Sequence, residues 1–326
     1  HLCGRRGESE VTGYVTDRAG VRWQLPPLLA WQLDYTAGVP CDSFWLRFLW
    51  KQGADANPRE WVEFQAEENG ERVFTGLVDE CERTRDSGGE VMEISSRGMA
   101  ARLLDNEALG QDYATATLAD ILRDHVTPYG ITVAPGASLP AVSQFSVAVG
   151  SSEWSVVYDF ARYYGGVAPR FDKLGRLVLT GWTEGQERVL GDSVPVTKLL
   201  CRDRRYGVLS RVLVRDRYSG AVQTVENGDF LALGGMARRV ITMPGRSTYK
   251  TLRYSGQFQL DKSQSQLERL EVEVALPFCA WPGDLVVLER SDWDRNGRYR
   301  VAQATVGMDE RGSWTRLDLA QPDFVV

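Results

Sequence analysis

The chain has very little histidine: His1 and His125 are the only two in 326 residues. A metal site built from imidazoles, or a Ser-His-Asp triad, would therefore depend on His125 alone. His125 falls in the last turn of an expected helix, just before Thr127 and Pro128, where an imidazole also suits the negative end of the helix dipole. We interpret His125 as a structural residue at a helix end, and we predict neither a metal site nor a catalytic triad.

Cysteines are also few, and they are widely separated. They show no Cys-x-x-Cys spacing and their number is odd, a pattern that suits a reducing cytoplasm. No apolar run approaches the roughly 20 residues that a membrane span needs, and residues 1–6 lack the apolar core that would follow the basic start of a secretory signal. We therefore expect no membrane partner.

Glycine is plentiful, but none of its motifs has the pattern of a phosphate-binding loop. The pairs Asn227-Gly228, Gly234-Gly235 and Pro244-Gly245 read as turns, because none lies between a strand and a helix with Gly-x-Gly-x-x-Gly or Lys-Ser/Thr partners. The sequence also shows no nucleophile with an activating base. We therefore expect no cofactor and no enzymatic activity.

Charge is distributed unevenly along the chain, whose 38 basic and 44 acidic residues give a net charge of −6. The stretch 201–255 holds eleven basic and four acidic residues, a local charge of +7, so the remainder carries −13. Arginines alternate along Arg211-Val-Leu-Val-Arg215-Asp-Arg217, and such a strand forms a solvated sheet face or pairs with acidic surface on a neighbouring subunit. We predict Arg215 and Arg217 as candidates for a subunit interface. Nucleic-acid binding is less favoured, since the chain is acidic overall and shows none of the recognised motifs.

Residues 1–105 read as a first β-barrel-like domain. Alternating apolar and polar residues, separated by turn signals, predict short strands at 21–25, 29–35, 44–50, 61–64, 71–79 and 90–96. The aromatic-rich segment 44–50 is expected to be buried on both faces. Several short strands at near-regular spacing indicate a barrel or a sandwich.

Residues 106–199 read as an α/β unit with two helices. Thr117 and Asp120 form a start like a capping box for the first helix. Ser152 precedes the second helix, in which aromatic and apolar residues recur at helical spacing. We interpret this stripe, which includes Trp154, as core and not as a ligand platform, because a helix must bury one face against the sheet.

Residues 200–326 read as a second β-barrel-like domain, with room for further α/β elements at 225–270. A hairpin is expected around Tyr218-Ser-Gly220, and the segment 262–270 fits either a short helix or a polar-faced strand. The predicted fold class is therefore mainly β with an α+β insertion: two similar β-barrel-like domains plus a two-helix α/β unit.

Four passages that cover most of the chain carry a resemblance to a known family. They are Phe74-Thr-Gly-Leu-Val-Asp79, residues 94–105, residues 117–179, and the run from Trp281-Pro-Gly-Asp284 through 297–301 to 317–319. In order and spacing, these passages resemble the baseplate hub proteins of contractile phage tails. That family includes the Mu-like type, its relatives in Gram-positive prophages and phage-derived bacteriocins, and the hub part of type VI secretion spikes.

The resemblance implies a homotrimer in which two similar barrels per subunit form a pseudo-sixfold ring. Such a ring would bind the sixfold tail tube on one face and a threefold spike on the other, beside other baseplate proteins. Nucleic acid would meet it at most by passage through the lumen. The subunit would assemble in the bacterial host cytoplasm and end in the baseplate of a phage virion or tail-like particle. The sequence ends at Val326 without a lysozyme domain or a spike β-helix, so we expect these as separate chains.

A carbohydrate-binding or cell-wall glycan-hydrolysing β protein is the alternative function. Ten tryptophans and twelve tyrosines would suit stacking on sugars, and the 44 acidic residues would include candidates for a carboxylate pair. So many acidic residues make some pair inevitable, however, and a sequence fixes no distance between carboxylates. The structural hub is therefore the favoured function.

Overall fold

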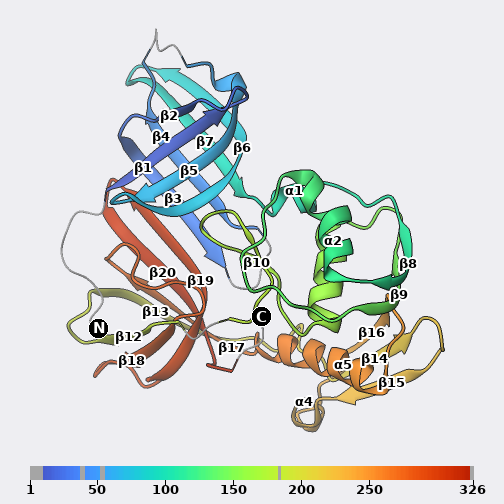
Figure 1. The fold of residues 1–326 in the computed structure, drawn as a ribbon. Coiled ribbons are helices and arrows are strands. Elements are labelled where there is room, and N and C mark those ends of the chain that lie inside the picture. Colours follow the sequence, from blue (N-terminus) through green and yellow to red (C-terminus); the bar gives the residue numbers. More distant parts are fainter. Residues whose placement is uncertain (1–9, 37–40, 52–55, 183–184, 324–326) are drawn as a thin grey trace.

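Two lobes of β-strands dominate the structure, a computed structural model that describes residues 10–36, 41–51, 56–182 and 185–323 (Figure 1). Thirteen strands belong to one sheet. Eleven of them follow one another in the order β13 (Val196–Asp203), β17 (Glu268–Val274), β20 (Gly312–Ala320), β19 (Gly297–Asp309), β3 (Leu28–Thr36), β4 (Ser43–Leu49), β7 (Gly89–Gly98), β6 (Glu71–Asp86), β5 (Trp61–Glu68), β1 (Val11–Asp17) and β2 (Arg22–Gln24). The sheet is completed by β18 (Leu285–Glu289), which pairs with β19, and by β12 (Glu187–Gly191), which runs parallel to β18.

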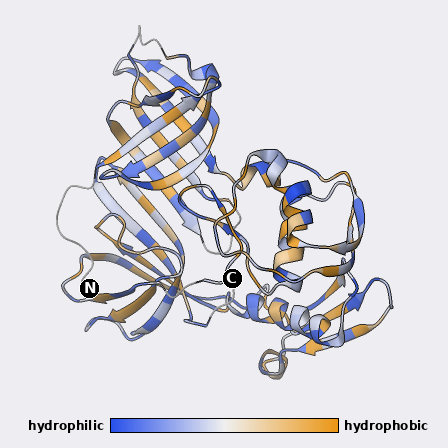
Figure 2. Cartoon of the chain, viewed as in Figure 1, coloured by the Kyte–Doolittle hydropathy of each residue, from blue (hydrophilic) through white to orange (hydrophobic). Residues whose placement is uncertain are grey.

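The N-terminal lobe, β1 to β7, has an aromatic core. In β4, Phe44, Leu46 and Phe48 are buried and alternate with the half-buried Trp45 and Arg47. The prediction that 44–50 is buried on both faces is therefore wrong, because the strand turns only one face to the core. Figure 2 shows the same banding of hydrophobic and hydrophilic residues along the strands of this lobe. A short 3-10 helix, η1 (Pro58–Glu60), precedes β5.

The long strand β19 joins the two lobes. Along one edge its residues 303–308 pair with residues 31–36 of β3, and along the other edge it pairs with β20. The prediction of two β-barrel-like domains is corrected accordingly: the strands form one continuous sheet, and within the described residues neither lobe closes into a barrel. Each lobe nevertheless has its own core, one around Phe44 and Phe64 and the other around Val272 and Leu317.

The predicted two-helix α/β unit is present beside the sheet. Its elements are α1 (Ala101–Leu104), β8 (Gln111–Ala116), α2 (Leu118–His125), the 3-10 turn η2 (Thr127–Tyr129), β9 (Val142–Val147), α3 (Glu153–Tyr158), the π-helical turn η3 (Asp159–Tyr164), β10 (Arg170–Phe171) and β11 (Leu177–Val178). The Thr117 side chain accepts a hydrogen bond from the backbone N–H of Asp120, whose side chain in turn accepts one from the backbone N–H of Thr117. Ser152 caps α3. Both predicted helix starts are therefore confirmed.

A second α/β element packs against this unit. It consists of β14 (Arg211–Asp216), β15 (Val222–Glu226), α4 (Gly228–Ala232), β16 (Arg238–Met243) and α5 (Tyr249–Gln264). The three strands form a sheet in the order β15-β14-β16, with β14 and β16 parallel, and α5 packs against β14 and β15. The undecided segment 262–270 contains the end of α5 and the start of β17.

Of the two expected domain boundaries, the one between 105 and 106 falls between α1 and β8. The expected boundary between 199 and 200 falls inside β13, which pairs along its length with β17 of the main sheet. The division into 1–105, 106–199 and 200–326 stays a prediction.

Candidate functional site

Arg215 and Arg217 flank the end of β14, where the buried Asp216 between them fixes the backbone. The Asp216 carboxylate accepts hydrogen bonds from the backbone N–H groups of Tyr218 (2.8 Å), Ser219 (3.2 Å) and Ser247 (3.0 Å). Burial opposes the charge of Asp216, but these donors outweigh it and hold the pKa of the carboxyl below its usual value. The two arginines therefore extend from a turn whose backbone is held in place.

The same turn is tied to the antiparallel strand pair β8–β9. The Tyr218 hydroxyl lies 2.7 Å from Ser146 Oγ, and Ser146 Oγ donates a hydrogen bond of 2.5 Å to Asp112. The backbone N–H of Ser146 donates to the carbonyl of Pro244 at 3.0 Å. These contacts hold β9 beside the chain that leaves β16.

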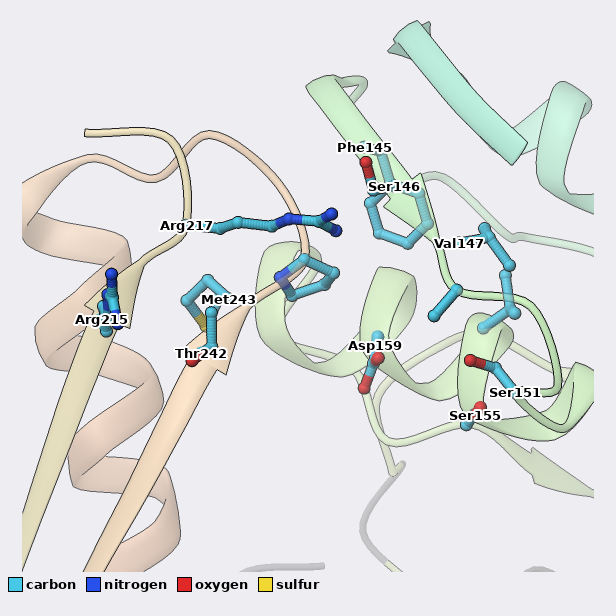
Figure 3. A pocket seen from close by; sticks show the side chains of 13 residues that line it. Phe145, Ser146, Val147, Ser151, Ser155, Asp159, Arg215, Arg217, Thr242 and Met243 are labelled. Carbon is cyan, nitrogen blue, oxygen red and sulfur yellow. The ribbon is translucent and has the colours of Figure 1, made fainter. Parts of the chain in front are cut away.

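A cavity of about 470 Å³ opens at this junction (Figure 3). Arg217 extends into it from the β14 side, toward β9, and Arg215 lies further back along β14. Asp159, Ser151 and Ser155 lie across from Arg217, on the segment around α3. The structure thus places both predicted interface residues at one pocket, which we call the arginine pocket.

Asp159 is a pocket residue that sequence reasoning missed. It is the first residue of the π-helical turn η3, and burial raises the pKa of its carboxyl to about 7. Within the described part of the chain, its side chain makes no hydrogen bond or ion pair, and neither do the exposed side chains of Arg215 and Arg217. Nothing in the local sequence marks Asp159, because the strands that complete its surroundings lie more than fifty residues further along the chain.

The composition of the arginine pocket suits the binding of an anionic group. A guanidinium presents a planar fork of N–H donors that matches a carboxylate. The pocket has two such forks, free of internal ion pairs, and Arg217 lies across from Asp159, whose carboxyl has a pKa raised to about 7. The Ser151 and Ser155 hydroxyls add polar groups at the opposite wall.

His125 ends α2, as predicted, and lies in a buried polar network. Its Nδ1 is 2.5 Å from Glu153 Oε2, and its Nε2 is 3.0 Å from the Tyr113 hydroxyl. The Tyr113 hydroxyl donates to Asp124 at 2.7 Å, and the Tyr129 hydroxyl donates to Glu153 at 2.8 Å. Both ring nitrogens are therefore held by protein groups that join α2, α3 and β8. Sequence reasoning found the helix end but missed Glu153, which only the packing of α3 on α2 brings to His125.

The cysteines depart in part from the prediction of a reducing environment. Cys41, Cys81 and Cys201 are free thiols, whereas Cys279 is disulfide-bonded. In the ranges that the structure describes, no group of three or more His, Cys, Asp and Glu side chains could hold a metal ion. None of the helices in those ranges combines the length and the apolar character needed to cross a bilayer.

None of the ten tryptophans has an exposed side chain. Trp154, on the aromatic stripe of α3, is 9% exposed and belongs to the core of the α/β unit, as predicted. The stripe is therefore not an exposed platform for sugars.

Comparison with known proteins shows agreement at the level of fold. No family model and no curated relative matches the chain. Among solved structures, the tail protein from Neisseria meningitidis MC58 matches with a TM-score of 0.79 and 15% sequence identity, covering 98% of each chain. A 43 kDa tail protein of prophage MuSo2 from Shewanella oneidensis matches with a TM-score of 0.73 and 18% identity, over 97% of this chain and 99% of that one. The chain has the fold of a phage tail protein.

A secretion-system component shares this tail-protein fold. An Escherichia coli component of the type VI secretion system matches with a TM-score of 0.58 and 13% identity, over 98% of this chain and 75% of that one. Its own description notes structural similarity to the phage T4 tail proteins gp27 and gp5. The resemblance inferred from the sequence is therefore confirmed for the fold.

Proposed function

We propose that this chain is a structural hub subunit in the baseplate of a contractile phage tail or phage-tail-like particle, where it adapts the sixfold tail tube to a threefold spike. The observation that carries this proposal is the agreement in fold with two tail proteins over 98% and 97% of the chain. The agreement includes both sheet lobes and the α/β elements, since nearly the whole length superposes.

The architecture supports an adapter between sixfold and threefold symmetry. Each subunit has two β lobes, so three subunits would present six lobes around one axis. The shared strand β19 holds the lobes in one continuous sheet, because its residues 303–308 pair with residues 31–36 of β3. A rigid pair of lobes is what a fixed docking surface for the tube requires.

The proposed partners follow from this role. The subunit forms a homotrimer, with the tube protein on one face, the spike protein on the other and further baseplate proteins around it. Arg215 and Arg217 face the neighbouring subunit. The chain is assembled in the cytoplasm of the bacterial host and is then part of the virion or tail-like particle.

The proposed role is structural, without enzymatic activity. Purified protein is expected to leave cell-wall glycan intact in a turbidity assay that responds to lysozyme. Turnover that one Asp or Glu substitution abolishes would contradict this and would favour the glycan-hydrolysing alternative. The aromatic stripe of α3 gives that alternative no support, because Trp154 is buried in the core of the α/β unit.

The hub proposal is tested by co-expression of this chain with the tube and spike proteins of the same particle. Affinity purification through a tag on the spike is expected to recover this chain and the tube protein together. Recovery of the spike and tube without this chain would contradict the proposal.

A further inference from the structure

The distal half of β6 is an arm with an unpaired edge. Residues 71–77 of β6 pair with β5 on one side, whereas residues 80–86 pair with β7 alone among the described strands. The side chains of Glu80 and Glu82 are exposed on this arm. They lie two residues apart, so they point to the same face of the strand.

This face of the arm carries excess negative charge. Glu82 lies directly opposite Glu93 of β7, and like charges in this position repel. Arg47 of β4 lies opposite Glu93 on its other side and pairs with it at 3.7 Å. Arg47 is thus one cation for two carboxylates, those of Glu82 and Glu93. Glu80 adds a third carboxylate, which has no ion pair within the described residues.

The arginine pocket, in contrast, carries excess positive charge. Arg215 and Arg217 are also two residues apart and also lack an ion pair within the described ranges. Exposed apolar surface lies close to the pocket, since Val149, which follows the lining residue Ala148, is 81% exposed. Leu109, which is 94% exposed, follows Ala108, whose carbonyl accepts a hydrogen bond of 3.1 Å from the backbone N–H of Gly150. Arginine is enriched in protein interfaces, and a contact at the pocket would also shield the exposed apolar side chain of Val149 from water.

We propose that Glu80 and Glu82 of one copy of this chain enter the arginine pocket of the next copy, where they pair with Arg215 and Arg217. The contact joins two different patches, one on the N-terminal β lobe and one on the α/β elements (Figure 1). A contact between different patches is head-to-tail, and it closes a ring when the rotation closes. This inference rests on the proposed hub function and names the contact that would hold its ring together.

This contact is tested by exchanging the charges of the four residues and measuring self-association by sedimentation velocity. The protein is measured alone over a range of concentrations and with the tube protein added. The double variant Arg215→Glu/Arg217→Glu and the double variant Glu80→Arg/Glu82→Arg are each expected to raise the apparent Kd of self-association at least about tenfold. The fourfold variant that combines them is expected to return to within about threefold of the wild type. All four positions are exposed, so unchanged thermal unfolding confirms that each variant is folded.

A matched control uses Asp294 and Glu310, which are exposed and make no ion pair within the described residues. Asp294→Arg/Glu310→Arg, added to Arg215→Glu/Arg217→Glu, is expected not to restore association. Full association by either double variant, or no recovery in the fourfold variant, would overturn the proposed contact. If a ring forms on the tube and the charge substitutions do not weaken it, only this contact is refuted. A wild-type chain that neither self-associates nor binds the tube refutes the hub function as well.

Discussion

Trp154 is the buried side chain on which the core assignment of α3 rests. Its ring centroid lies 6.4 Å from that of Tyr158 and 6.2 Å from that of Phe171. Trp154→Ala empties this site, so the free energy of unfolding is expected to fall by about 3–5 kcal/mol. Urea unfolding measures this free energy. The control is Tyr206→Ala, at a 76% exposed position, which is expected to change the free energy of unfolding by less than about 0.5 kcal/mol. Wild-type stability of Trp154→Ala would show that the ring is not part of the core.

Asp159 makes the stability of the protein depend on pH in a predictable direction. Burial raises the pKa of its carboxyl from 3.8 to about 7 in the folded state. Between these values the folded chain keeps a proton that the unfolded chain releases. The contribution of Asp159 to the free energy of unfolding therefore falls as pH rises from about 4 to about 7, and is constant above that.

The variant Asp159→Asn cannot titrate at this position. We expect its stability to fall less than that of the wild type between pH 5 and pH 7, as measured by urea unfolding at each pH. Because Asn carries no buried charge, the variant should be at least as stable as the wild type above pH 7. Parallel pH profiles for the two proteins would contradict the assignment.

At the scale of elements, the cap of α2 is a local feature with a measurable effect. The Thr117 side chain accepts a hydrogen bond from the backbone N–H of Asp120 at 3.2 Å. Thr117→Ala removes this acceptor, so the free energy of unfolding is expected to fall by about 1 kcal/mol. The exposed Thr115→Ala, on the preceding strand, is the control and should change stability by less than about 0.5 kcal/mol. Equal effects of the two substitutions would mean that the cap contributes nothing.

Elements with local signals were predictable from the sequence, and elements without them were not. The caps at Thr117 and Ser152 and the turn at residues 218–220 depend on neighbouring residues, so sequence alone located them. The expected α/β elements at 225–270 are present, but the sequence did not show where α5 begins and ends, because its buried face includes Ser255, Gly256 and Gln259 and so lacks a continuous apolar stripe. The parallel pairing of β14 with β16 could not be predicted from the sequence, because β15 and α4 separate the two strands along the chain.

For the whole molecule, the sequence predicted the elements but not the way in which the lobes join. Gln303 pairs with Thr36 across more than 260 residues of chain, and no local pattern encodes that register. Hence the sequence predicts two β-barrel-like domains where one sheet runs through both lobes. The arginine pocket was only half predictable for the same reason: Arg215 and Arg217 stand out by local charge, whereas Asp159 joins them only through the fold.

The central claim is that this chain forms a threefold ring between tube and spike. Cryo-electron microscopy of the co-expressed chain, tube protein and spike protein tests it most directly. We expect three copies of this chain around one axis, six β lobes against the tube, and a buried interface on the order of 2,000 Å² between neighbours. A persistent monomer or a twofold dimer in that mixture would contradict the claim.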